Sequence, residues 1–214
     1  MKNANSIYSG QNEIHKPRRY KYAHYYLFTI VLFIAGFISG NAVSYELNNK
    51  DLLRVINPVI NTIHGLSAEK SFMLLLESFF THFIYIFIIW FLSLTIIGII
   101  LVVFIVFFDG FMYGVVIGSF TYQLSLQGFL VGFFYTFPQN IILIPLLIYI
   151  SSHSIRLSLS IFHTFIYQSS RKTLKLILNE YYNKLFFAVG VLVIYALIMS
   201  IFGNVFIDIL KSLI

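Results

Sequence analysis

The chain has 214 residues, of which 59% are hydrophobic and only 10% are charged; it has a formal net charge of +6 and no cysteine. Soluble domains carry about 25% charged and about 45–50% apolar residues, so this composition excludes an ordinary soluble enzyme, a disordered chain and collagen. Without cysteine, thiol catalysis, disulfides and cysteine-bound zinc are excluded too. The apolar runs are continuous rather than alternating, which argues against a β-barrel. The predicted fold class is an all-α, polytopic integral membrane bundle.

The first 24 residues form a basic segment with five Lys or Arg and one acid. Tyr25–Ser44 follows without a charge, and twenty residues at about 1.5 Å each span about 30 Å, one hydrocarbon thickness. The apolar core of a signal peptide has about 7–15 residues, so we predict a retained first span.

Residues 45–77 are amphipathic and carry charges of both signs. Apolar residues recur at helical spacing, and Pro58 inside the pattern predicts a bend or a new turn. We expect this segment to lie outside the cell and to dock partner proteins through its apolar face. The residues of this predicted docking face are Leu52, Ile56, Ile60 and Ile63.

Residues 78–155 contain a single charge, Asp109, and are long enough for two to four spans. The segments 1–24 and 151–184 are basic, so the positive-inside rule places both in the cytoplasm and requires an odd number of crossings between 45–77 and 151–184, hence three. A final span over 185–203 leads to a short external tail, 204–214. The prediction is one membrane domain, 25–203, with five spans, the N-terminus inside and the C-terminus outside.

The boundaries inside residues 78–155 have two solutions. Either the second helix is long and strongly tilted, or the chain breaks near Gly98 and Asp109 lies within the membrane. Asp109-Gly110 is a common turn pair, so a cytoplasmic turn is the favoured interpretation. An acid at a helix centre costs about 2.5–3.5 kcal/mol on insertion scales and would indicate a functional site. The sequence predicts no second ionisable group paired with this acid inside the spans.

Glycines recur four residues apart, a spacing that brings helix backbones close together. Packing between helices of this chain is the favoured interpretation, and dimerisation or docking of a partner's span is the alternative. These glycines are Gly36, Gly40, Gly110, Gly114, Gly118, Gly128 and Gly132.

Two prolines seven residues apart, Pro138 and Pro145, predict a kinked helix with freed backbone carbonyls. Gln139 and Asn140 add side-chain amides to the same apolar region. The favoured interpretation is a kink satisfied by neighbouring helices, and the alternative is a broken-helix substrate site as in transporters.

Leu174, Ile177, Leu178 and Tyr181 share one helix face in the basic cytoplasmic segment. The polar side provides the predicted cytoplasmic interface, Arg171, Lys172 and Lys175. Such a helix suits the inner membrane surface or docking of a cytoplasmic protein.

No catalytic motif accompanies these features. The six histidines have no H-E-x-x-H or other close ligand spacing, and neither G-x-S-x-G nor a phosphate-binding glycine loop is present. We therefore predict no catalytic residue, no metal site, no cofactor and no enzyme activity. The net charge follows membrane topology, so no nucleic-acid partner is predicted, and the bilayer is the expected surrounding.

The middle of the chain resembles the stage II sporulation protein M family over roughly residues 20–200. The most specific part is Pro138-Gln139-Asn140-Ile141 with Pro145. Asp109 departs from the family pattern, in which a basic residue is usual. The remaining matching positions are Ser78–His82, Tyr85-Ile86, Trp90, Ile96–Gly98, Gly110, Gly114, Gly118 and Gly128-Phe129.

This resemblance implies a role in endospore formation, when the mother cell engulfs the forespore. It implies a non-enzymatic scaffold in the septal and engulfing mother-cell membrane, part of a peptidoglycan-remodelling complex. The implied partners are stage II sporulation proteins D and P, anchored cell-wall hydrolases that the scaffold recruits and positions. The alternative is a permease-like subunit coupled to an ATPase through the basic cytoplasmic helix; a homodimer is compatible with either.

Overall fold

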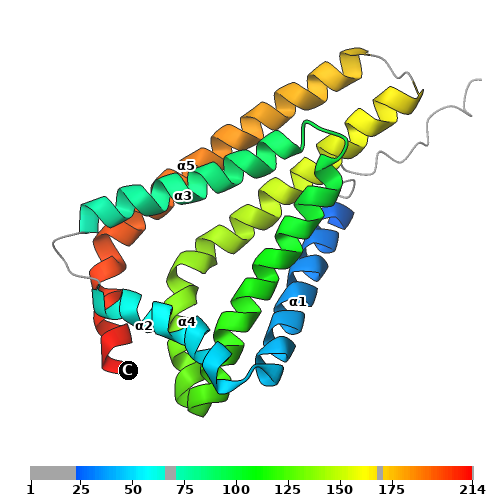
Figure 1. Cartoon of the computed structure of the whole chain (residues 1–214). Coiled ribbons are helices and arrows are strands. Elements are labelled where there is room, and N and C mark those ends of the chain that lie inside the picture. Colours follow the sequence, from blue (N-terminus) through cyan, green and yellow to red (C-terminus); the bar gives the residue numbers. More distant parts are fainter. Residues whose placement is uncertain (1–22, 66–70, 168–170, 214) are drawn as a thin grey trace, which may run out of the picture.

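The computed structural model describes residues 23–65, 71–167 and 171–213, and these ranges are helical apart from short connections, with no strand (Figure 1). Four apolar stretches are long enough to cross a membrane, and a shorter one, Phe79–Leu92, lies in α3. The predicted all-α, polytopic membrane bundle is therefore confirmed. The helices are α1 (Ala23–Glu46), α2 (Asn49–Gly65), α3 (Ser71–Leu92), α4 (Gly98–Tyr167) and α5 (Arg171–Leu213). The four long stretches are Ala23–Glu46, Gly98–Thr136, Asn140–Ile166 and Tyr181–Met199.

Ser125 divides α4 into two limbs. Its backbone angles, φ 53° and ψ −132°, are not helical, and a positive φ is uncommon for a residue other than glycine. The chain reverses here, so the outgoing limb (98–124) and the returning limb (126–167) run side by side (Figure 1). Residues 123–127 include neither glycine nor proline, but Gly128 follows directly, and a Cβ there would overlap the backbone of Phe120 in the outgoing limb.

The helix ends alternate between the two ends of the bundle. Four points lie toward the upper right of Figure 1: the start of α1, the α3–α4 link, the end of α4 and the start of α5. The reversal in α4, the whole of α2 and the end of α5 lie toward the opposite end. This order agrees with an odd number of crossings between α2 and the start of α5. The side that faces the cytoplasm stays a prediction.

The structure decides between the two solutions for residues 78–155. Helix α3 ends at Leu92, and α4 begins at Gly98, where a Cβ would overlap the backbone of Leu92. Asp109 and Gly110 are helical and lie well inside the outgoing limb. The interpretation of Asp109-Gly110 as a cytoplasmic turn is therefore wrong. The chain breaks near Gly98 instead, which leaves the outgoing limb continuous and puts Asp109 inside an apolar helix.

Helix α1 lies along the outgoing limb of α4 through facing glycines. A Cβ added at Gly36 or Gly40 would overlap the backbone of the outgoing limb. One added at Gly110 or Gly114 would overlap the backbone of α1. These faces are thus used inside the chain and leave no free surface for a partner's span. The other predicted glycines are also enclosed, Gly118 against Ser44, and Gly128 and Gly132 against the end of the outgoing limb.

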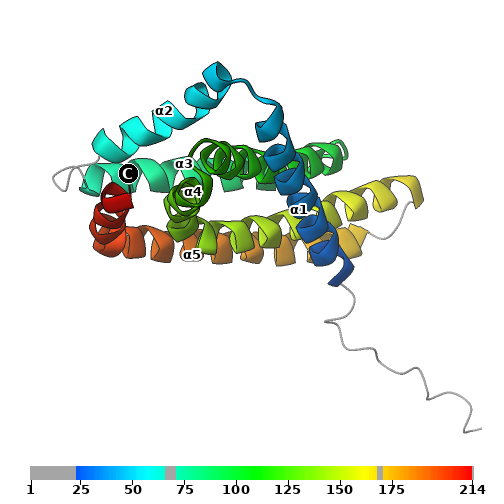
Figure 2. The same cartoon turned by 90° about the horizontal axis from the view of Figure 1, so that it is seen from below.

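Helix α2 packs its apolar stripe on α4 at the end of the bundle where Ser125 reverses the chain (Figure 2). Leu52 and Ile56 are 1% and 3% exposed, and Ile60 is partly buried against Phe120 and Val131. The predicted docking through this face needs correction, because the chain itself covers these residues. The side chain of Ile63 lies outside the described residues.

The returning limb of α4 is the centre of the bundle. In its most apolar window 61% of the residues are buried, against 22–28% in the other three long apolar stretches. The main hydrophobic core gathers residues of α1, α3, both limbs of α4 and α5, including Ile89, Val106, Ile150 and Leu192. Each other spanning segment therefore presents most of its surface outward, as expected for helices that face lipid.

A glycine-to-alanine pair tests the packing of α1 on α4. Gly114→Ala forces apart two helices in backbone contact, and overpacking of this kind costs about 1–3 kcal/mol. Gly190→Ala is the matched control, since no atom lies within 4 Å of an added Cβ there and alanine is the better helix former. We expect thermal unfolding in detergent to show a lower Tm for Gly114→Ala and an unchanged or higher Tm for Gly190→Ala. Equal shifts for both variants would contradict the packing described.

Candidate functional site

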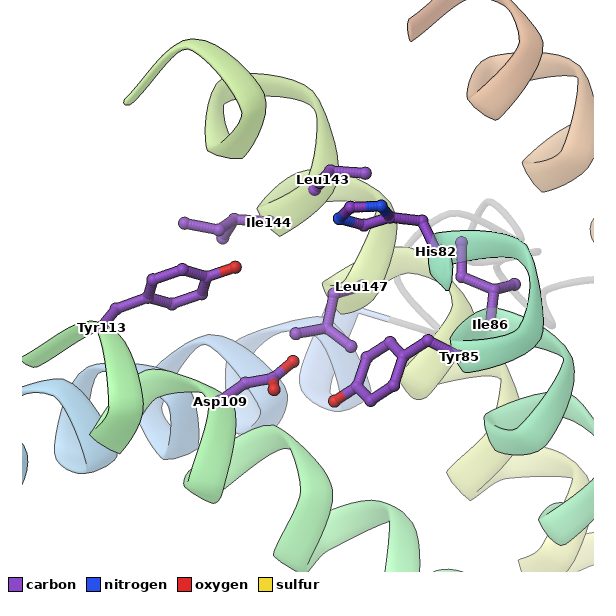
Figure 3. A pocket seen from close by; sticks show the side chains of 8 residues that line it. All are labelled: His82, Tyr85, Ile86, Asp109, Tyr113, Leu143, Ile144 and Leu147. Atoms are coloured by element: carbon purple, nitrogen blue, oxygen red, sulfur yellow. The ribbon is translucent and has the colours of Figure 1, made fainter. Parts of the chain in front are cut away.

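Asp109 lies on the side of the outgoing limb that turns toward α3 (Figure 3). Its carboxylate accepts a hydrogen bond from the hydroxyl of Tyr85, and His82 is close enough to interact with it electrostatically. Both partners come from α3. The expectation that no ionisable group is paired with this acid is therefore wrong, because the fold brings a histidine of another helix beside it.

Tyr113, one turn after Asp109, extends this contact to the returning limb. Its hydroxyl is hydrogen-bonded to the side chain of Asn140, which is only 7% exposed. The ring of Tyr195 in α5 lies 5.6 Å from the ring of His82, centroid to centroid. These polar side chains connect α3, both limbs of α4 and α5. We name them the Asp109 cluster, which consists of His82, Tyr85, Asp109, Tyr113, Asn140 and Tyr195.

A cavity of about 40 Å³ lies beside this cluster (Figure 3). His82, Tyr85, Asp109 and Tyr113 line its polar part, and apolar residues such as Leu147 close the rest. One water needs about 10–15 Å³ in such a measure, whereas small-molecule sites occupy about 300–1,000 Å³. The cavity has room for a few waters and is too small for an organic substrate, so the arrangement is suited to joining helices by hydrogen bonds.

A second group of polar side chains joins the α3–α4 link to the returning limb and to α5. The hydroxyl of Tyr181 is hydrogen-bonded to those of Ser93 at 2.8 Å and Ser154 at 2.6 Å, and Ser158 donates to the Ser93 carbonyl at 2.7 Å. The ring of Trp90 stacks on Tyr181 at 6.0 Å between centroids. All four hydrogen-bonding residues are buried. We name this group the serine cluster.

Helix α1 contributes a third set of polar contacts to the returning limb. Thr29 and Ser152 are hydrogen-bonded through their hydroxyls at 2.8 Å, and the Tyr26 hydroxyl lies 3.0 Å from Nε2 of His153. Ser151, Ser152, His153 and Ser154 are all buried, although they point to different sides of one helix. The returning limb is thus surrounded at this level and hydrogen-bonded to α1 and α5.

The basic segment 151–184 differs from its prediction. Residues 151–167 are the end of the returning limb, and α5 is continuous from Arg171 to Leu213. Leu178 and Tyr181 pack against Trp90 and Leu157 of the bundle. These two residues therefore do not face the membrane surface as predicted. The side chains of Arg171, Lys172 and Lys175 lie outside the described residues.

The proline motif lies in the returning limb, whose backbone stays helical through it although the ribbon bends in this part (Figure 1). Asn140 points inward to Tyr113, and Pro145 is exposed on the outer surface. The side chains of Pro138 and Gln139 lie outside the described residues. The contact of Asn140 agrees with a kinked helix whose amide is satisfied by a neighbouring helix.

Sequence reasoning missed His82, Tyr85, Tyr113 and Tyr195 as members of one site. A signal existed, because His82 and Tyr85 are three residues apart and Asp109 and Tyr113 are four apart, so each pair shares a helix face. Polar faces on two apolar helices are expected to turn into the bundle, away from the lipid. The sequence could not show that these two faces meet each other.

Together, the apolar spans and the polar contacts buried between them define a multi-pass α-helical membrane protein. The profile of the family described as stage II sporulation protein M matches residues 27–207, which include α2, α3, α4 and nearly all of α1 and α5. The chain belongs to this family and is a sporulation-related membrane protein. Comparison with curated proteins and with solved structures gave no significant match.

A double-mutant cycle tests the contact between α3 and α4. Tyr85→Phe removes the hydroxyl that donates to the partly buried carboxylate of Asp109, and the unsatisfied acceptor costs about 1–3 kcal/mol. We expect a lower Tm in detergent for this variant. In an Asp109→Leu background the same change has little further effect, because its partner is already gone.

Tyr122→Phe is the control for this cycle, since Tyr122 lies on the same limb as Asp109 and is 50% exposed. We expect its Tm to match that of the parent protein. If Tyr85→Phe is as neutral as the control, or if the effects of Tyr85→Phe and Asp109→Leu simply add, the contact contributes nothing to stability.

Proposed function

We propose that this protein is a non-enzymatic membrane scaffold of a peptidoglycan-remodelling complex that drives engulfment during endospore formation. In this role it recruits stage II sporulation proteins D and P, the anchored cell-wall hydrolases, and positions them at the septal and engulfing mother-cell membrane. The observation that carries the proposal is the family match over residues 27–207, which includes nearly all of the described helices. The same match gives no support to the permease-like alternative.

The packing of α2 supports a specific place for the hydrolases' outer domains. Because its apolar stripe is buried on α4, α2 is held against the bundle with its other side exposed. That exposed side includes Leu53 and Arg54, and Arg54 forms an ion pair with Asp51 at 2.9 Å. We place the contact with the outer domains on this exposed side instead of on the apolar stripe. Among its described side chains it is a polar surface with one large exposed apolar residue, which suits a water-facing interface.

The experiment is a gentle purification of the tagged protein from sporulating cells, with mass spectrometry of the proteins that accompany it. We expect the two anchored hydrolases in the parent sample. Leu53→Glu with Arg54→Glu places negative charge on the exposed side of α2 and should lower their recovery at least tenfold, since it removes an apolar contact and reverses a charge.

Gln123→Glu with Leu124→Glu is the matched control, because it changes one polar and one apolar neighbour next to the exposed reversal in α4. Recovery of the hydrolases should stay at the parent level. Thermal unfolding in detergent verifies that both variants fold. Capture of a cytoplasmic ATPase without hydrolases would refute the scaffold proposal. If the α2 variant still recovers the hydrolases, the interface with them does not lie on the exposed side of α2.

A further inference from the structure

An apolar groove of about 400 Å³ runs between the returning limb of α4 and α5 on the outer surface of the bundle. Ile141, Pro145 and Tyr149 line it from α4 at four-residue spacing, so they form one stripe. Phe187 and Val191 line it from α5. The side chains of Ile141 and Phe187 are 57% and 58% exposed, so the groove opens outward, toward the lipid.

The length of the groove matches one leaflet of a bilayer. Eight residues separate Ile141 from Tyr149, which is about 12 Å along a helix. Half of the hydrocarbon core is about 15 Å thick. The groove volume also falls within the range of about 300–1,000 Å³ that small-molecule sites occupy. A single acyl chain therefore fits along it.

One end of the groove is basic and aromatic. The Lys184 ammonium lies 5.9 Å from the centroid of the Tyr149 ring, and that ring is 5.3 Å from the ring of Phe187. Arg156 follows on the returning limb, two turns beyond Tyr149. Among the described side chains, Lys184 and Arg156 therefore give this end of the groove a positive charge. Aromatic rings next to cations are typical of the level where headgroups begin.

We infer that this groove binds an anionic phospholipid, with an acyl chain between Ile141 and Val191 and the headgroup phosphate at Lys184. A phospholipid is the occupant that meets both features, since it has an apolar chain of one leaflet's length and a negative group at its end. Basic sites between spans are known to hold anionic headgroups. By the predicted topology the lipid belongs to the cytoplasmic leaflet. The inference is independent of the hydrolase partners.

The test is native mass spectrometry of the purified full chain in detergent, incubated with phosphatidylglycerol or phosphatidylcholine of identical acyl chains. We expect the parent protein to retain phosphatidylglycerol preferentially. Lys184→Gln should weaken that retention about fivefold, the effect of losing one basic contact, whereas Lys184→Arg should preserve it. Retention of phosphatidylcholine should not respond to either change.

A second pair of variants tests the groove itself. Val191→Trp fills the groove and should lower retention of both lipids, whereas Ile194→Trp, on an exposed part of the same helix, should not. Thermal unfolding verifies that the tryptophan variants fold, and the Lys184 variants test the headgroup site independently of them. Equal retention of the two lipids by the parent protein would overturn the inference, as would unchanged retention in Lys184→Gln. The inference of a lipid site is also wrong if Val191→Trp dissociates a dimer or releases a partner's span while lipid retention stays the same.

Discussion

The structure depends on how the returning limb of α4 satisfies its polar side chains without water. In a hydrocarbon surrounding, a hydroxyl or amide without a partner is costly. A hydroxyl can donate to a carbonyl of its own helix, as Thr136 does to Gly132 at 2.9 Å, and other polar groups have to meet another helix. Ser152, Ser154 and Asn140 are buried on this limb, and each has a hydrogen-bond partner on another span. Thr29 belongs to α1, Tyr181 to α5, and Tyr113 to the outgoing limb. The limb is therefore central for a chemical reason: the other spans gather around its polar side chains.

Two kinds of contact between helices stabilise the bundle. Between α1 and the outgoing limb, glycines let the backbones approach, and the contact is mainly van der Waals packing. Between α3, α4 and α5, the Asp109 cluster and the serine cluster supply directional hydrogen bonds. Both the glycine faces and the apolar stripe of α2 are buried in contacts between helices of this chain. Among the described residues, the lipid-facing surface and the exposed side of α2 remain open to partners, whereas the glycine faces and the apolar stripe of α2 do not.

Composition and charge predicted the class of fold because they depend on lengths and on the cost of burying charge, which are properties of single segments. The break near Gly98 was one of two solutions, and only the tertiary contact of Gly98 with Leu92 decides it. The reversal is at Ser125 and not at a glycine or proline, although Gly128 nearby allows the two limbs to approach closely. A positive φ at a serine is not indicated by residue type. An amphipathic helix such as α2 has an apolar stripe whether it covers lipid, a partner or its own bundle. Periodicity shows that the stripe is buried and cannot show by what.

The Asp109 cluster is best explained by register. A buried polar group often adds no net stability compared with well-packed apolar residues. A gain in the stability of the fold therefore does not by itself explain why these polar residues are present. Helix α3 is apolar on most of its surface, and in lipid an apolar helix gains little from one rotation over another. The hydrogen bond from Tyr85 to Asp109 and the bonds of Ser93, directly after the end of α3, together fix the rotation and the height of this helix. Since α2 ends at Gly65 and α3 begins at Ser71, fixing α3 also limits where α2 can lie. In the proposed scaffold, a polar cluster deep in the bundle thereby orients the surface offered to the hydrolases.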